Sequence, residues 1–347
     1  MAAIAGNLDT VRPHKGMLFI TNHMMNKDRQ FDPKGAKEEM DALSLGRVKF
    51  DEANNQPRAI VRYCRFDPDH PDGHEVISAS TFIDDLWNSK AKHVLFYIHG
   101  FNSEPETSPW EYGVFTQAAA LQAQFDSIEP NNTQIVLLIW PCGNRFGILR
   151  DYWSDQIAAH MSAAAFEVAL GKFLKWSRLQ QPVPADEAKW PYVMAHSMGN
   201  RLLLSTMDLA KIEDDVGANA FRGIFMVAAD VVNEALEGHS SIAEAARTVS
   251  VYHAWDDKAL IGSKYANLVS KGSWSRRLGT TGPEDMTKVS GNVYAVDCAD
   301  FNVGVDPFLL GHNYFTENII VDGKEKPNPV VAHIYNTMQL GRVDTTI

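Results

Sequence analysis

The sequence contains few cysteines and no long hydrophobic run. Its three cysteines, Cys64, Cys142 and Cys298, are an odd number at wide spacing, which fits neither a disulfide framework nor a zinc-binding cluster. We therefore expect buried, reduced thiols. The two most apolar stretches, "HVLFYIHG" and "QIVLLIWP", are far shorter than the roughly 20 residues that span a bilayer. Membrane insertion is not expected.

Positive charge is also scarce. The chain has 32 basic against 43 acidic residues, a formal net charge of −11, and no Lys/Arg-rich run that could follow a phosphate backbone. We expect no nucleic-acid partner. The N-terminal "MAAIAGNLDTVRPHKG" lacks the basic start, apolar core and cleavage site of an export signal, so the expected location is cytoplasmic.

No Pro/Ser-rich linker, internal repeat or low-complexity tract divides the 347 residues. Length alone would allow two average domains, but single α/β domains also reach this size. We predict one domain over 1–347. Within it, 1–90 supplies N-terminal strands, 91–320 the catalytic core and 321–347 a C-terminal extension.

Short β-like apolar runs alternate with longer helical patterns after residue 90. This alternation is typical of a mainly parallel sheet covered by helices. The predicted strands are 93–99, 134–140, 192–196, 223–229, 248–254 and 292–298. The predicted helices are 111–126, 153–178, 198–211, 233–246 and 258–270.

The first 90 residues differ, because "GMLFIT", "RVKF" and "RAIVRYC" indicate strands joined by short polar turns. We expect them to form an antiparallel edge of the same sheet, as many mixed sheets have. The predicted fold class is α/β, with a mostly parallel central sheet of about eight strands and helices on both faces.

Two irregular stretches follow the first two core strands, "GFNSEPETSPWEY" and "PCGNRFGILRDYW". Open α/β sheets bind ligands at these carboxyl ends of the strands. The aromatic residues there suit either pocket walls or core anchors, and the sequence favours neither. They are Trp110, Trp140, Phe146, Tyr152 and Trp153.

The pentapeptide "AHSMG" places Ser197 between a strand-like run and a helical pattern. This is the nucleophile-elbow pattern, with Ala195 in place of the usual first glycine; small residues on both sides let the strand and helix approach closely. Ser240, in "GHSSIAEAA", has no preceding strand and no following glycine. We expect Ser240 or Ser241 to be a helix N-cap, with Glu244 as a capping-box partner.

A serine nucleophile needs a base, and the base needs an acid to orient it. In this architecture the chain order is serine, acid, histidine, with the acid after a later strand and the histidine after the last. In "WDDKAL", Asp257 is the preferred acid, because the apolar "ALI" begins soon after it. Asp256 and Asp230 remain alternatives.

Only His312, in "GHNYF", and His333, in "VVAHIYN", follow the last core strand. His312 lies in a segment with loop character and is the predicted base. His333 follows a β-like run, which indicates packing against the sheet.

An acyl-transfer site also needs donors for the oxyanion. We predict the backbone N–H groups of Met198, after the serine, and of Phe101, in "YIHGFN". Gly100 would let the backbone come close to the substrate. We expect His99 to support this loop through hydrogen bonds and not to act as a base.

The cluster "DPDHPDGHE" places His70 and His74 among carboxylates and could hold a divalent ion. Its two prolines and glycine favour a solvated turn instead. We expect no metal and no cofactor.

Nine short motifs now occur in a recognisable order: "MLFITN", "FYIHGFN", "LIWPCG", "DYWSD", "AHSMGNRLLL", "VAADVV", "VYHAWDDKAL", "RRLG" and "GHNYF". Together they resemble the α/β-hydrolase superfamily, specifically a bacterial esterase/lipase-like family formerly catalogued as a domain of unknown function. The resemblance covers most of the chain, from about residue 17 to 320. It implies a hydrolase with a Ser-Asp-His triad at Ser197, Asp257 and His312, and says little about the substrate.

The favoured hypothesis is a serine carboxylesterase acting on a small-molecule acyl substrate. An amidase, lactonase, thioesterase or acyltransferase would use the same residues. A non-catalytic binding protein on the same fold is the alternative from another class. The oligomeric state is left open.

Overall fold

A computed structural model of the chain describes most of the sequence. The described residues are 3–4, 13–23, 50–51, 56–57, 61–70, 73–101, 103, 105, 113–142, 148–179, 188–213, 217–271, 275–299, 311–316, 318–321 and 323–347.

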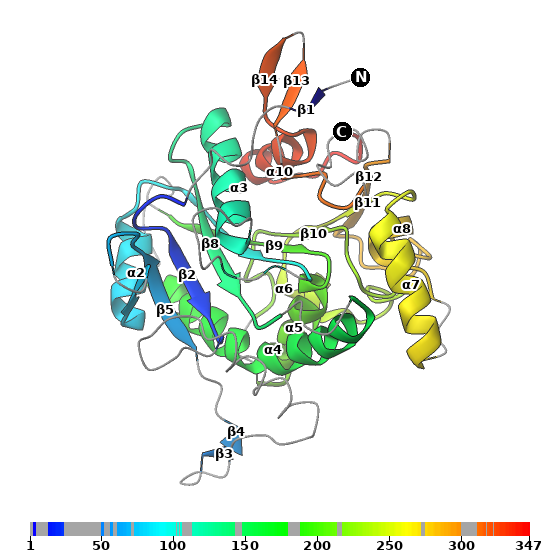
Figure 1. Cartoon of the computed structure of the whole chain (residues 1–347), viewed down its shortest axis with the longest axis horizontal. Coiled ribbons are helices and arrows are strands. Elements are labelled where there is room, and N and C mark those ends of the chain that lie inside the picture. Colours follow the sequence, from blue (N-terminus) through cyan, green and yellow to red (C-terminus); the bar gives the residue numbers. More distant parts are fainter. Residues whose placement is uncertain are drawn as a thin grey trace.

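A nine-stranded sheet forms the centre of the molecule (Figure 1). In spatial order its strands are β12 (Val293–Asp297), β11 (Val249–His253), β10 (Gly223–Val227), β9 (Trp190–His196), β7 (His93–Ile98), β8 (Thr133–Ile139), β2 (Leu18–Thr21), β5 (Arg62–Phe66) and β6 (His74–Ile77). The run from β12 to β2 is parallel throughout. Strands β5 and β6 form the antiparallel edge. This confirms the predicted fold class, with one strand more than expected.

The N-terminal strands depart from the prediction in one respect. We expected "GMLFIT" to lie within the antiparallel edge, but β2 pairs in parallel with β8 and antiparallel only with β5. The chain therefore reverses direction between β2 and β5. Of "RVKF", only Phe50 is among the described residues, in a small hairpin of β3 (Phe50–Asp51) and β4 (Gln56–Pro57).

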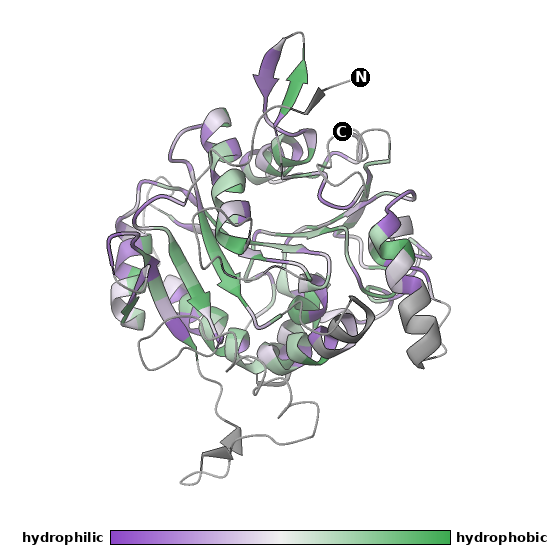
Figure 2. Cartoon of the chain, in the orientation of Figure 1, coloured by the Kyte–Doolittle hydropathy of each residue, from purple (hydrophilic) through white to green (hydrophobic). Residues whose placement is uncertain are grey.

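Helices cover both faces of the sheet. Successive side chains of each strand point to opposite faces, so each strand contributes to two hydrophobic cores. Phe96 of β7 faces one core and Tyr97 faces the other. The first face is covered by α2 (Ala79–Asn88), α4 (Ile148–Leu179), α5 (Gly199–Glu213), α6 (Ser241–Ala245) and α8 (Leu278–Thr281). The second is covered by α3 (Val114–Ile128), α7 (Lys258–Lys271) and α10 (Pro329–Leu340). In Figure 2 the central strands β2 and β8 are coloured as hydrophobic, as double coverage requires.

One predicted helix is wrong over most of its length. The pattern at 233–246 predicted a helix, but only Ser241–Ala245 is helical. The preceding residues form turns, held by bridges from Val232 to Arg277 and from Glu237 to Val289. The predicted N-cap is present: Ser240 accepts a hydrogen bond from the N–H of Ala243. Glu244 binds Lys211 and His239 and forms no capping box with Ser240 in the hydrogen bonds of the described residues.

Helices α2, α8 and α10 lie where we predicted none. Helix α2 begins after Ser78, whose hydroxyl accepts from the N–H of Thr81. The β-like run before His333 is part of α10, which starts with Asn328 as N-cap and Pro329 in its first turn. Before α10, β13 (Ile319–Val321) pairs with β14 (Lys324–Lys326) and with β1 (Ala3–Ile4).

Helix α4 has an apolar stretch, Asp155–Leu179, that by length and composition could cross a membrane. In the fold, 67% of its apolar window is buried inside the protein. Its residues pack against the first core and α5, and the Phe173 ring meets Phe96 of β7 edge-on at 5.0 Å. This packing is typical of a core helix in a large α/β sheet.

Replacement of Phe173 tests how firmly α4 is docked. Phe173→Ala should lower the free energy of unfolding by about 3–5 kcal/mol, because it leaves a cavity against Phe96. Urea unfolding measures the change. The control is Met161→Ala on the same helix, whose side chain is 42% exposed and should cost less than about 1 kcal/mol. Equal effects at the two positions would contradict this packing.

Candidate active site

Ser197 lies on the sharp turn between β9 and α5. Its φ is +51°, in the left-handed region that glycine adopts readily. For a residue with a side chain this conformation costs about 1–3 kcal/mol of conformational free energy. Hydrogen bonds hold the turn in place: the Ser197 N–H donates to the Val227 carbonyl at 3.0 Å, and its carbonyl accepts from the Asp230 N–H at 3.1 Å. Asn200 adds donations to the carbonyls of Ala195 and Ser197.

The small residues on either side of Ser197 have the effect that the sequence pattern predicts. A Cβ atom at Gly199 would lie 2.6 Å from the carbonyl oxygen of His99 and 2.9 Å from that of Ile98. Ala195 is fully buried and pairs with Ile98 across the β7–β9 ladder. Helix α5 therefore starts in direct contact with the end of β7, and Ser197 projects above it.

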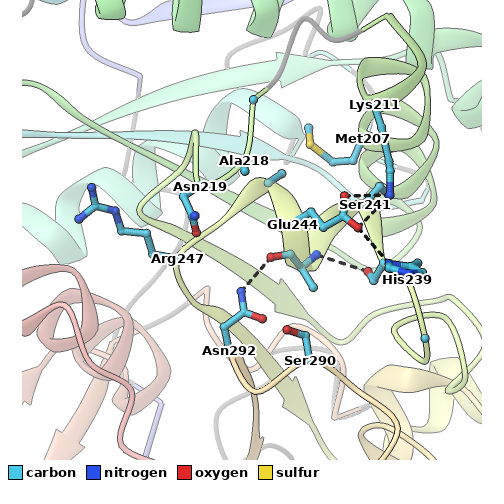
Figure 3. A pocket seen from close by; sticks show the side chains of 15 residues that line it. Met207, Lys211, Ala218, Asn219, His239, Ser241, Glu244, Arg247, Ser290 and Asn292 are labelled. Atoms are coloured by element: carbon cyan, nitrogen blue, oxygen red, sulfur yellow. Dashed lines mark hydrogen bonds and ion pairs between the residues drawn. The ribbon is translucent and has the colours of Figure 1, made fainter.

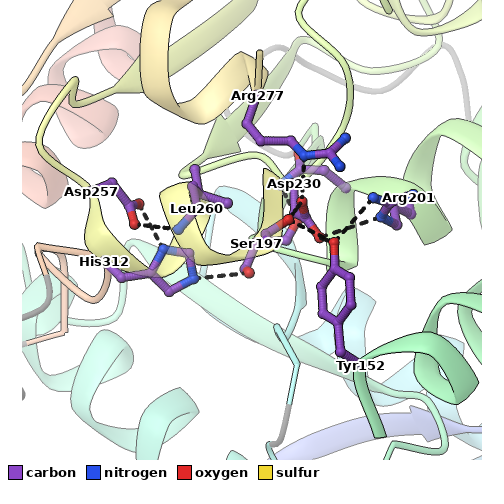
Figure 4. A network of polar contacts seen from close by, with 10 residues as sticks. Tyr152, Ser197, Arg201, Asp230, Asp257, Leu260, Arg277 and His312 are labelled. Carbon is purple, nitrogen blue, oxygen red and sulfur yellow. Dashed lines mark hydrogen bonds and ion pairs between the residues drawn. The ribbon is translucent and has the colours of Figure 1, made fainter. Parts of the chain in front are cut away.

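The structure brings Ser197, His312 and Asp257 together (Figure 4). Ser197 Oγ lies 2.9 Å from His312 Nε2, and His312 Nδ1 lies 2.7 Å from Asp257 Oδ2. A neutral imidazole has one donor and one acceptor nitrogen. With Nδ1–H donating to the carboxylate, Nε2 can accept the serine proton.

Asp257 is fully buried, and its second carboxylate oxygen is also bonded. Oδ1 accepts from the N–H of Leu260 at 2.9 Å, so Asp257 caps the start of α7. The adjacent Asp256 is half-buried, and the carboxylate that accepts from His312 Nδ1 is that of Asp257.

The two alternative residues from the sequence have other partners. His333, on α10, bonds to the Tyr252 hydroxyl and to the Asp344 carbonyl. The Asp230 carboxylate accepts from the hydroxyls of Tyr152, at 2.7 Å, and Ser263.

Asp230 is the centre of a buried charge cluster beside Ser197 (Figure 4). Arg201 Nε lies 3.4 Å from one carboxylate oxygen and Arg277 Nε 3.3 Å from the other. Burial alone would raise the pKa of Asp230, but the two guanidinium groups reverse this effect and lower it below its ordinary value. Asp230 is therefore an anion held by two cations. No local sequence pattern indicates this cluster, because its members are far apart along the chain.

The loop after β7 runs close to the serine. A Cβ atom at Gly100 would lie 2.8 Å from His196 Nδ1 and 3.0 Å from Ser197 Cβ. Phe101, the predicted donor, follows at once and is half-buried; Met198, the other predicted donor, is fully buried at the start of α5. The structure thus places both predicted positions next to Ser197.

His99 supports this loop through hydrogen bonds, as its sequence context predicts. Its Nδ1 donates to the Gly100 carbonyl at 2.9 Å, its Nε2 accepts from the Trp140 N–H, and the two rings stack at 5.3 Å. Burial lowers the pKa of His99 to about 4. The ring is therefore neutral at physiological pH.

His196, which had no predicted role, contacts His312 directly. Its Nε2 donates to the His312 carbonyl at 3.2 Å, and the ring centroids are 4.8 Å apart. Burial lowers its pKa well below the ordinary value. Its position immediately before Ser197 is the only sequence signal that could have suggested a contact with the site.

The remaining aromatic candidates divide between core and site. Trp140 is fully buried and anchors His99. Tyr152 is buried against Phe101 and Asp230, and Trp153 packs at the margin of the first core. Trp110 and Phe146 lie outside the described residues.

The described residues of the motif "DPDHPDGHE", 67–70 and 73–75, lead into β6, and the Gly73 N–H donates to the His70 carbonyl. Lys15 binds the carboxylates of Asp67 and Asp69, and His74 packs edge-on against Phe19. Within the described ranges, no group of three or more His, Cys, Asp or Glu side chains is placed to hold a metal ion. The three cysteines are buried thiols.

A cavity of about 730 Å³ lies at the amino ends of the parallel strands, opposite the end that carries Ser197 (Figure 3). Its lining includes Asn219, Arg247 and Asn292, which precede β10, β11 and β12. Because the strands are parallel, this cavity is remote from Ser197, which follows the carboxyl end of β9.

The parallel sheet, the serine turn after its central strand and the helices on both faces define an α/β hydrolase. The chain belongs to the family described as alpha/beta hydrolases of unknown function, DUF900, whose model matches residues 75–325. No curated protein matches the chain significantly.

The contact at Gly199 yields a matched pair of glycine substitutions. Gly199→Ala should lower the free energy of unfolding by about 2 kcal/mol or more, because the new Cβ meets backbone oxygens that cannot move away. Gly262→Ala, on α7 with nothing within 4 Å of its Cβ, should instead stabilise by up to about 1 kcal/mol. Urea unfolding measures both. A neutral Gly199→Ala variant would contradict the close approach of α5 and β7.

The buried histidines make stability depend on pH. Burial in the folded protein lowers the pKa of His99 and of His93 to about 4. Between pH 6.5 and pH 4 these histidines are therefore protonated in the unfolded chain and neutral in the folded chain. Their stabilising contribution is complete above pH 6.5 and is lost as the pH falls toward 4, at about 1.4 kcal/mol per pH unit for each group. Urea unfolding at pH 7.5, 6 and 5 should show this fall.

The control for this pH dependence is His93→Phe, which can keep the ring contacts with Trp190 and Tyr192. It should reduce the slope between pH 6 and pH 5 by about 1.4 kcal/mol per unit. An unchanged slope would show that His93 titrates normally in the folded protein.

Proposed function

We propose that this protein is a serine hydrolase that cleaves carboxylic esters of small molecules through an acyl-enzyme. The observation that carries the proposal is the continuous hydrogen-bonded chain from Ser197 Oγ through His312 to Asp257, at 2.9 and 2.7 Å. These distances lie within the range in which a positioned base can take a proton from a hydroxyl. The strained turn, which exposes a serine at the end of a parallel strand, also supports this function.

In the acylation step, Ser197 Oγ attacks the ester carbonyl carbon while its proton passes to His312 Nε2. The C–O bond to the alcohol then breaks, and His312 returns the proton to the leaving alkoxide. Asp257 keeps the Nδ1–H tautomer in place and stabilises the imidazolium that forms. Its burial and its bond to the Leu260 N–H fix the carboxylate in one orientation.

In the deacylation step, water replaces the alcohol. His312 Nε2 takes a proton from the water as its oxygen attacks the acyl carbon, and the proton then passes to Ser197 Oγ as the acid leaves. The neutral state of His196 and His99 matters here, because a charged neighbour would oppose formation of the His312 imidazolium.

The developing oxyanion would be held by the backbone N–H groups of Phe101 and Met198. Support for this assignment comes from the close approach of Gly100 to Ser197, where an added Cβ would lie 3.0 Å from Ser197 Cβ, because Phe101 directly follows Gly100 and Met198 directly follows Ser197. Such donors stabilise negative charge that exists only in the transition state and the tetrahedral intermediate.

A fluorophosphonate probe and a short-chain ester test the proposal directly. The wild type should be labelled and should hydrolyse the ester, whereas Ser197→Ala should lose labelling and about 10⁴-fold or more of kcat. Ser205→Ala is the matched control, because Ser205 lies on the same helix but its hydroxyl bonds to His160. Labelling that persists in Ser197→Ala would reject Ser197 as the nucleophile.

Neighbouring aspartates provide a second test within the same assay. Asp257→Asn should lower kcat by about 10³–10⁴, because the amide no longer fixes the required tautomer. Asp256→Asn should stay within about threefold of the wild type. A larger loss of kcat in Asp256→Asn than in Asp257→Asn would assign the role of triad acid to Asp256. Turnover of amides without turnover of esters would overturn the proposed reaction.

A further inference from the structure

Tyr152 connects the loop after β7 to the charge cluster behind the serine turn. Its ring meets the Phe101 ring edge-on, with centroids 5.9 Å apart and an interplanar angle of 76°. Its hydroxyl donates to Asp230 Oδ2 at 2.7 Å and lies 2.6 Å from Ser263 Oγ. Tyr152 is 7% exposed and Asp230 is 1% exposed, so the Asp230 end of this connection is buried, while Phe101 at the other end is half-buried.

Asp230 also fixes the serine turn, through two further bonds. Its backbone N–H donates to the Ser197 carbonyl at 3.1 Å. Its carboxylate pairs with Arg201, one helical turn beyond Ser197 on α5. Asp230 thus bonds both to Ser197 and to Arg201 at the start of α5. Movement of the serine turn relative to Asp230 would therefore break a buried ion pair.

A continuous path therefore runs from the Phe101 side chain through Tyr152 and Asp230 to Ser197. Its two ends flank the backbone N–H groups assigned above to the oxyanion, those of Phe101 and Met198. Donors stabilise an oxyanion only when they lie about 2.7–3.1 Å from it, and productive geometry tolerates displacements of roughly 0.5 Å. The relative position of these two peptides thus depends on a connection that lies outside both of them.

We propose that Tyr152, anchored on Asp230, is a positioning residue that sets the separation of the two oxyanion donors. The inference rests on the proposed function of Ser197 and extends it to a residue outside the hydrogen-bonded chain of Ser197, His312 and Asp257. Because the oxyanion exists only on the reaction path, loss of Tyr152 affects kcat and leaves ground-state binding nearly unchanged.

Two substitutions separate the ring from the hydroxyl. Tyr152→Leu removes the contact with Phe101 and should lower kcat about thirtyfold, less than the 10²–10³ for loss of a whole donor. Tyr152→Phe keeps the ring but loses the anchor, and should lower kcat about threefold. In both, KM should stay within about twofold and the midpoint of the pH–rate profile should not shift, because the His312–Asp257 pair is untouched.

The matched control is Tyr335→Phe. Tyr335 is a buried tyrosine of α10 whose hydroxyl bonds to Glu129 and Asn132, at the other end of β8. It should retain wild-type kcat and KM. Titration with a fluorophosphonate counts the competent sites of each variant, so that kcat refers only to folded protein.

Binding of a trifluoromethyl ketone provides a readout that a purely structural role would not change. Ser197 Oγ attacks the ketone carbon and forms a tetrahedral adduct. The proton of the serine hydroxyl passes to His312, and the ketone oxygen occupies the oxyanion position. Its inhibition constant should rise by the same factor as kcat/KM falls in the Tyr152 variants.

Wild-type kcat per titrated site in Tyr152→Leu, or an unchanged inhibition constant, would overturn the inference. An equal loss in kcat and in the number of competent sites, with normal kcat per site, would assign Tyr152 a role in stability alone and also overturn it. Absence of labelling in the wild type would reject the proposed function itself, so the two failures are distinguishable.

Discussion

The left-handed backbone of Ser197 is the constraint on which the rest of the site depends. A φ of +51° at a residue with a side chain is unfavourable, so the turn persists only because its surroundings allow no relaxed alternative. Strand β10 accepts the Ser197 N–H, Asp230 donates to its carbonyl, and Gly199 brings α5 against the end of β7. The strain is therefore balanced by β10, by the loop after it and by the packing of α5 against β7.

Two buried carboxylates flank this turn and have different environments. Asp257 faces one imidazole and one backbone N–H, so its charge is directed toward His312. Asp230 faces two guanidinium groups and two hydroxyls, so its charge is neutralised within the scaffold. A carboxylate that already binds two cations has little capacity left to stabilise an imidazolium. The two environments thus distinguish a carboxylate bonded to an imidazole from one neutralised by two guanidinium groups, although both follow parallel strands.

The sequence predicted the local parts of the site and not its long-range supports. The strand, turn and helix around Ser197 are encoded in adjacent residues. The order of the strands left His312 and His333, and the loop character of "GHNYF" favoured His312. The choice of Asp257 over Asp256 had a local signal that went unused, because an aspartate immediately before "KAL" is a typical helix N-cap. The Asp230 cluster had none, since Arg201 and Arg277 are distant from Asp230 in sequence and meet it only through the tertiary fold. The error at 233–246 has the same origin: bridges from distant segments replaced helical turns.

The segment that carries Asp230 is as constrained as the serine turn. Ala228, two residues before it, also adopts a left-handed φ of +46°. A Cβ atom at Gly279 would lie 2.2 Å from the backbone nitrogen of Ala229, so α8 is pressed directly onto this segment. Arg277 lies two residues before Gly279, so this close packing places its guanidinium beside the Asp230 carboxylate. The turns after β9 and β10 are thus two strained elements joined by a hydrogen bond from Asp230 to Ser197, and neither can relax without displacing the other.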